Sequence, residues 1–126
     1  MATSPRLLIV DDDEVMLRAV SSQLRRAGWP HWRIETSSTP VDPSGFDVAL
    51  LDWVPYGETM AAWCRSWRIP FVVFTGGDTD NVLESLGGTL SGAVVVAKPY
   101  RIEDLRANLL NALATRPPVA EVLREG

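Results

Sequence analysis

Five short strand-like segments, separated by stretches with helical spacing, most constrain what this chain can fold into. They are Arg6–Val10, Trp32–Thr36, Val48–Leu51, Phe71–Phe74 and Ala93–Ala97. All but the second are almost continuously apolar, which is typical of strands buried on both faces. Short apolar strands that alternate with helices predict a single doubly wound parallel sheet of α/β class, covered by helices on both sides.

Four segments are predicted to be covering helices: Glu14–Ala27, Thr59–Trp67, Thr79–Leu86 and Ile102–Ala114. Asp13 is expected to cap the first of them and Gly28 to end it. Its apolar side is predicted to comprise Val15, Met16, Ala19, Val20 and Leu24. The connection Ser37–Phe46 holds two prolines and is shorter than the usual helical crossover of about a dozen residues. We therefore predict that the second crossover helix is reduced or missing.

The predicted helix Thr59–Trp67 carries an apolar stripe at helical spacing, formed by Met60, Trp63, Cys64 and Trp67. One interpretation is that the whole stripe belongs to the core. The other is a partly exposed tryptophan pair used for self-association into a homodimer. The sequence leaves both interpretations open.

The composition indicates one domain, with a core over about residues 5–114 and a C-terminal tail over 115–126. A net charge of −4 without a basic stripe argues against direct binding of nucleic acid. The single cysteine, Cys64, excludes an internal disulfide and fits a reducing compartment. Because no apolar stretch is long enough to span a bilayer and the N-terminus lacks a signal-peptide profile, we expect a cytoplasmic protein without a membrane segment.

Lys98 is the only lysine of the chain, and it follows the last strand-like segment directly. Every other basic side chain except His31 is an arginine, so a lysine here suggests a task that arginine performs badly. Lysine offers a compact charge on a flexible stem, which suits a buried anion such as a phosphoryl group. The ordinary alternative is a lysine whose stem packs along the strand end while its ammonium group reaches water.

Acidic residues follow two of the other strands. Asp11 and Asp12 come after the first segment, and Asp52 comes after the third. Because ligands of doubly wound sheets bind at the carboxyl ends of the strands, we expect these side chains to converge there. Converging carboxylates repel each other unless a cation lies between them, and Mg²⁺ prefers such oxygen ligands. The sequence therefore predicts a site for Mg²⁺ together with a small oxyanion.

Four motifs in order resemble the signature of response-regulator receiver domains: Leu7–Asp12, Val48–Asp52, Phe71–Gly76 and Val94–Pro99. The resemblance extends to about Leu113 and implies five parallel strands in the flavodoxin-like order 2-1-3-4-5. It also implies a phosphoacceptor in a two-component phosphorelay, signalling through protein–protein contact. The implied partners are a sensor histidine kinase or phosphotransfer protein and a downstream protein target. No enzyme activity is implied beyond Mg²⁺-dependent self-phosphorylation and dephosphorylation.

The resemblance assigns the metal site to four residues. Asp52 would be phosphorylated and, together with Asp12, would ligate Mg²⁺ directly. The backbone carbonyl of Val54 would be the third protein ligand, and Asp11 would act through water. The turn Asp52–Gly57 is contracted relative to the family pattern.

The phosphoryl group would be held by a second set of residues. Thr75 would donate a hydrogen bond, Gly76 would leave room and offer its backbone N–H, and Lys98 would pair with the charge. The resemblance also implies a cis peptide bond before Pro99, which would aim Lys98 into the crevice. Val95 occupies the position of the usual aromatic switch residue, so the usual coupling between Thr75 and an aromatic side chain is not expected.

Two alternatives remain beside this interpretation. The segment Leu8–Val15 also resembles the first motif of haloacid-dehalogenase-type phosphohydrolases, in which Asp11 would be the nucleophile and Asp13 the acid/base. The other alternative is a pseudo-receiver that binds partners without being phosphorylated.

Overall fold

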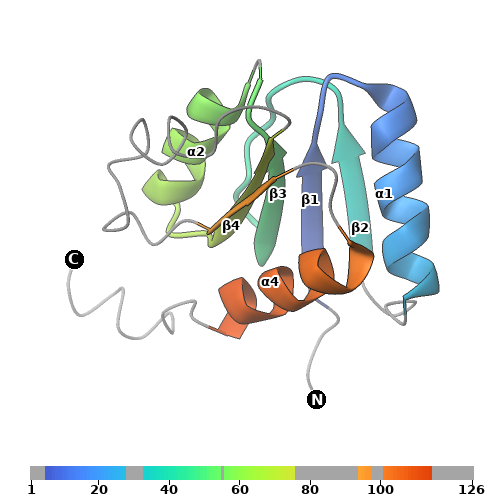
Figure 1. The fold of residues 1–126 in the computed structure, drawn as a ribbon. Helices are drawn as coiled ribbons and strands as arrows, with labels where there is room; N and C mark the ends of the chain where they lie inside the picture. Colours follow the sequence, from blue (N-terminus) through green and yellow to red (C-terminus); the bar gives the residue numbers. More distant parts are fainter. Residues whose placement is uncertain (1–4, 28–32, 55, 76–93, 98–100, 115–126) are drawn as a thin grey trace.

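The computed structural model describes residues 5–27, 33–54, 56–75, 94–97 and 101–114. The elements along these residues, drawn in Figure 1, are β1 Arg6–Val10, α1 Glu14–Arg26, β2 Arg33–Ser37, β3 Val48–Asp52, α2 Gly57–Ser66, β4 Phe71–Thr75, β5 Val94–Ala97 and α4 Ile102–Ala114. The predicted helix Thr79–Leu86 lies outside the described residues. No helix among the described residues is long and apolar enough to cross a membrane.

The sheet is parallel throughout. β1 pairs with β2 on one side and β3 on the other, so that Leu7 lies opposite both Ile34 and Val48. β4 follows β3, which confirms the predicted α/β class and the strand order 2-1-3-4. Val94–Ala97 runs alongside β4, with Ala97 opposite Thr75. Because all these strands run in one direction, their carboxyl ends meet at one end of the sheet.

Side chains of each central strand alternate between two hydrophobic clusters, one on each face of the sheet. Leu7 and Ile9 belong to the cluster under α1 and α4, whereas Leu8 and Val10 belong to the cluster under α2. Figure 1 shows α2 set apart from α1 and α4. The prediction that the apolar strands are buried on both faces is therefore confirmed for β1, β3 and β4.

The buried side of α1 differs from the prediction. Val15 is 68% exposed and Ala19 is also exposed, so both assignments were wrong. The buried face of the helix is instead formed by Leu17, Val20, Ser21 and Leu24. These four residues have the spacing of one helix face, and they include the polar but small Ser21.

No helix forms between β2 and β3, where every residue from 38 to 47 is described, so the prediction of a missing crossover helix is confirmed. Two residues of this loop cover the sheet in its place, since Phe46 is buried and Val41 packs against the same cluster. The guanidinium of Arg6 lies 4.5 Å from the centre of the Phe46 ring. Gly45 has a φ of +88°, a conformation that favours glycine.

α2 begins two residues before the predicted start and presents two different faces. Met60 and Cys64 are fully buried, whereas Trp63 and Trp67 are 41% and 56% exposed. The interpretation of all four residues as one core stripe was therefore wrong. The predicted exposure of the tryptophan pair is confirmed, and its use for self-association stays a prediction.

Candidate metal and phosphoryl site

Three carboxylates meet at the carboxyl end of the sheet. Asp11 and Asp12 follow β1 and Asp52 ends β3, and each offers an oxygen within 4.8 Å of the others. Asp11 is only 2% exposed, Asp52 is half-buried and Asp12 is exposed. The cluster therefore runs from the protein interior to the surface, and its outer carboxylates are within reach of a ligand from solvent.

Local backbone hydrogen bonds explain how the β1 acids are placed. The backbone N–H of Asp11 donates to the carbonyl of Ser37 at 3.1 Å, which extends the ladder with β2. The Oδ1 atom of Asp11 accepts the N–H of Asp13 at 2.9 Å, so the chain turns sharply into α1. This turn holds the Asp11 side chain at the inner end of the cluster.

Asp13 serves as the N-cap of α1, as predicted. Its Oδ1 atom accepts the backbone N–H groups of Val15 at 3.0 Å and Met16 at 3.3 Å. These bonds satisfy two donors that the first turn of a helix otherwise leaves without partners. The side chain is thereby engaged with the helix and is not a member of the carboxylate cluster.

Asp52 is held by the sheet on one side and by α2 on the other. It lies opposite Phe74 in the β3–β4 register, and the next residue, Trp53, donates its N–H to the Phe74 carbonyl at 3.2 Å. The carbonyl of Trp53 in turn accepts the N–H of Gly57 at 2.9 Å. Thr75 is the last residue of the adjacent strand β4 and is only 4% exposed.

The donor set suits a hard divalent cation. All three side chains offer carboxylate oxygens, which Mg²⁺ and Ca²⁺ prefer over the nitrogen and sulfur ligands typical of zinc sites. The spacing within 4.8 Å allows one ion to contact oxygens from more than one of them. The arrangement therefore fits the predicted Mg²⁺. Val54 follows in the turn after β3 with its side chain exposed, and the role of its carbonyl stays a prediction.

The other predicted phosphoryl ligands, Gly76 and Lys98, lie outside the described residues, as does Pro99. Thr75 and Ala97 are opposite each other in the sheet, and each directly precedes one of the predicted ligands. The described ends of β4 and β5 thus lie one residue beyond the level of Asp52 in the sheet.

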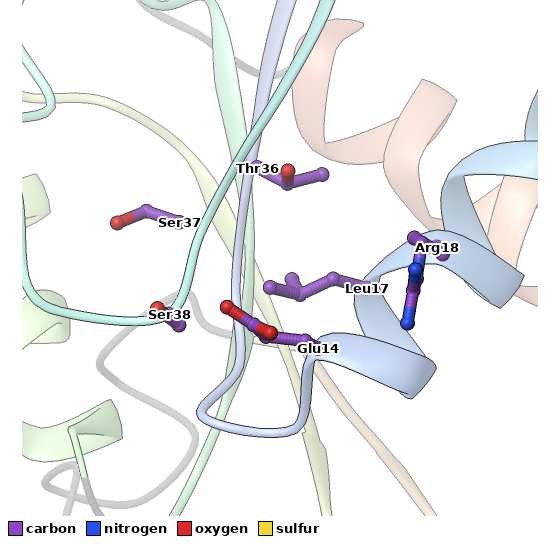
Figure 2. A pocket seen from close by; sticks show the side chains of 6 residues that line it. All are labelled: Glu14, Leu17, Arg18, Thr36, Ser37 and Ser38. Carbon is purple, nitrogen blue, oxygen red and sulfur yellow. The ribbon is translucent and has the colours of Figure 1, made fainter.

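A pocket of about 290 Å³ beside α1 was not predicted from the sequence. Figure 2 shows Glu14 and Leu17 reaching from α1 toward the residues that end β2. Its other lining residues are Arg18, Thr36, Ser37 and Ser38. In the sequence, the only indication of this pocket was the run of four hydroxyl-bearing residues from Thr36 to Thr39.

A second pocket of about 350 Å³ lies between the β2–β3 loop and α2. Its lining comprises Pro40, Val41, Asp42, Pro43, Trp63, Ser66 and Trp67. The two exposed tryptophans therefore form part of the wall of this pocket.

Cys64 lies on the buried face of α2 and is not a member of the carboxylate cluster. Burial raises the pKa of its thiol to about 12, because the thiolate would lose its hydration. A thiol with so high a pKa is a poor nucleophile near neutral pH, so Cys64 belongs to the packing of the core.

Comparison with known proteins gives matches in structure only. No protein-family model matches the sequence, and no curated protein matches it. A CheY-like response regulator receiver domain protein from Methanospirillum hungatei is 25% identical with a TM-score of 0.71, over 98% of this chain and 100% of that chain. A response regulator receiver domain protein from Clostridium thermocellum is 22% identical with a TM-score of 0.72, over 87% of this chain and 94% of that chain.

A third similar structure is a response regulator protein from Burkholderia pseudomallei with a phosphorylated aspartic acid, a calcium ion and citrate. It is 20% identical with a TM-score of 0.68, over 97% of this chain and 72% of that chain. These matches agree with the strand order and with the motifs that resemble the same family. The chain therefore has the fold of response-regulator receiver domains.

Proposed function

We propose that this protein is a phosphoacceptor of a two-component phosphorelay, phosphorylated on Asp52 by a histidine kinase or phosphotransfer protein in the cytoplasm. The observation that carries the proposal is the convergence of Asp11, Asp12 and Asp52, with carboxylate oxygens within 4.8 Å of one another. In the proposed domain, β5 completes a five-stranded sheet, and Lys98, the next residue in the sequence, would reach the site. The phosphorylated form would signal through contact with a downstream protein.

In phosphoryl transfer the protein mainly positions the reacting groups and neutralises the charge of the phosphoryl oxygens. A carboxylate oxygen of Asp52 attacks the phosphorus of a phosphohistidine in line with the P–N bond, which breaks as the new P–O bond forms. The imidazole leaves with the electron pair of the broken bond. Asp12 and Asp52 would hold Mg²⁺ directly and Asp11 through water, and the ion would supply positive charge for the phosphoryl oxygens. Thr75 donates a hydrogen bond to one of these oxygens, and Lys98 pairs with another.

The exposure of the acids favours Asp52 over Asp11 as the nucleophile. Asp52 is half-buried, whereas Asp11 is 2% exposed and accepts the N–H of Asp13. The dehalogenase-type alternative also needs Asp13 as an acid/base, and that side chain caps α1. The phosphorylated aspartic acid and calcium ion of the similar Burkholderia pseudomallei protein support the receiver chemistry.

Acetyl phosphate, a small phosphodonor, tests the proposal without a known kinase. Incubation with acetyl phosphate and Mg²⁺ should add the mass of one phosphoryl group to the intact protein, and a chelator should prevent the addition. Asp52→Asn should add none. The matched control Asp104→Asn, which changes an exposed carboxylate on α4, should be modified like the wild type. An unmodified wild-type protein, or equal modification of Asp52→Asn, would count against the proposal.

A further inference from the structure

Gly57, the first residue of α2, occupies a position with no room for a side chain. A Cβ atom built there would lie 2.7 Å from Cε3 and 3.3 Å from Cδ2 of the Trp53 ring. It would also lie 3.0 Å from the backbone carbonyl oxygen of Asp52. Gly45 is the only glycine with a positive φ among the described residues, so Gly57 is needed for space and not for an unusual backbone angle.

The atoms that crowd this position belong to the proposed phosphorylation site. Asp52 carries the carboxylate, and Trp53 is the next residue along the chain. The Trp53 side chain packs against the core cluster under α2, as does that of Tyr56. Two backbone hydrogen bonds fix the same residue, from Trp53 to Phe74 at 3.2 Å and from Gly57 to Trp53 at 2.9 Å. Neither the ring nor the peptide can therefore move without loss of packing or hydrogen bonds.

We propose that Gly57 is a positioning residue for Asp52. Without a Cβ, it lets the Trp53 ring lie against the first turn of α2, and this contact holds the peptide that follows Asp52. The Asp52 carboxylate is thereby kept within reach of Asp11 and Asp12. The inference rests on the proposed function, because it assigns Gly57 to the assembly of the same metal and phosphoryl site.

Gly57→Ala separates this role from helix stability. Alanine is the better helix former, so intrinsic propensity alone predicts no harm from the substitution. The added methyl group must instead displace the Trp53 ring or the Asp52 carbonyl. Groups that orient metal ligands commonly change metal affinity about tenfold or more when they are altered. We therefore expect the affinity for Mg²⁺ to fall about tenfold or more in Gly57→Ala.

The rescue variant tests whether the ring transmits the effect. Replacing Trp53 by valine removes both ring contacts and leaves only the carbonyl at 3.0 Å. The double variant Trp53→Val/Gly57→Ala should therefore bind Mg²⁺ with nearly the affinity of Trp53→Val alone. A purely structural role for Gly57 would not predict this recovery. Thr59→Ala, at an exposed position in the same helix, is the matched control and should bind like the wild type.

Calorimetric titration with Mg²⁺ alone gives the affinities, and circular dichroism shows that each variant is folded. Equal affinity in the wild type and Gly57→Ala would overturn the inference. Absence of Mg²⁺ binding by the wild type would instead overturn the proposed function. If Gly57→Ala does not fold, the comparison passes to the double variant and Trp53→Val. A folded double variant that has lost the Mg²⁺ binding of Trp53→Val would overturn the inference.

Discussion

At the scale of single residues, the identity of the cation at position 98 is the sharpest test of the phosphoryl site. Lys98→Arg keeps the positive charge but replaces a compact ammonium group by a planar fork. We expect slower phosphorylation of Asp52 by acetyl phosphate, with Mg²⁺ affinity close to that of the wild type. Time courses of intact mass measure the rate. A variant as fast as the wild type would remove the argument that this lysine is required.

A second prediction concerns Cys64 and the stability of the fold at alkaline pH. Its pKa is raised to about 12 in the folded protein, so above about pH 9 the unfolded chain loses a proton that the folded protein retains. The folded state then binds more protons than the unfolded state, and stability falls as pH rises. The contribution is at most about 1.4 kcal/mol per pH unit between about pH 9 and pH 12. Below pH 9 the thiol is protonated in both states and contributes no pH dependence.

Urea unfolding at several alkaline pH values measures this slope, with Cys64→Ala as the comparison. The variant is expected to be less stable at neutral pH, because it leaves a small cavity in the core. Its free energy of unfolding should nevertheless fall less steeply with pH than that of the wild type. Equal slopes in the two proteins would show that Cys64 does not titrate differently on unfolding.

At the scale of elements, α2 has one face in the core and one that carries the tryptophan pair. Met60 is fully buried, so Met60→Ala should cost about 2–5 kcal/mol of stability. Trp67→Ser, on the exposed face, should cost much less, since over half of the side chain already lies in solvent. Thermal or urea unfolding compares the two variants. A larger loss in Trp67→Ser would contradict the orientation of the helix.

The positions of β1, β3 and β4 were predictable because a polar residue follows each apolar run. β1 has the predicted bounds, and β3 and β4 each extend by one residue, to Asp52 and Thr75. The buried face of α1 was not predictable in the same way. Val15 and Leu17 are both apolar, and only the position of the helix against the sheet decides which is buried.

The acid cluster was predictable and the contact at Gly57 was not. Parallel strands bring their carboxyl ends together, so the positions of Asp11, Asp12 and Asp52 after the strands were enough. The fit of the Trp53 ring against Gly57 depends on how the contracted turn after β3 enters α2. No periodicity or motif in the sequence carries that information.

At the scale of the whole molecule, binding of Mg²⁺ should stabilise the fold. A ligand that binds only the folded state raises its stability as the ligand concentration exceeds the dissociation constant. The melting temperature of the wild type should therefore rise with Mg²⁺, and the rise should be largely lost in Asp12→Asn. Because this substitution also removes one of three neighbouring negative charges, the metal-free variant should melt no lower than the wild type. A full Mg²⁺ response in Asp12→Asn would exclude Asp12 as a ligand.

The central claim is that an acyl phosphate forms on one side chain, and chemical trapping tests it most directly. Borohydride reduces an acyl phosphate on aspartate to the alcohol, which converts the residue to homoserine and marks the site permanently. After treatment with acetyl phosphate and Mg²⁺, peptide mass spectrometry should find homoserine at position 52. Homoserine at position 11, or a stable phosphate on a hydroxyl side chain, would contradict the account.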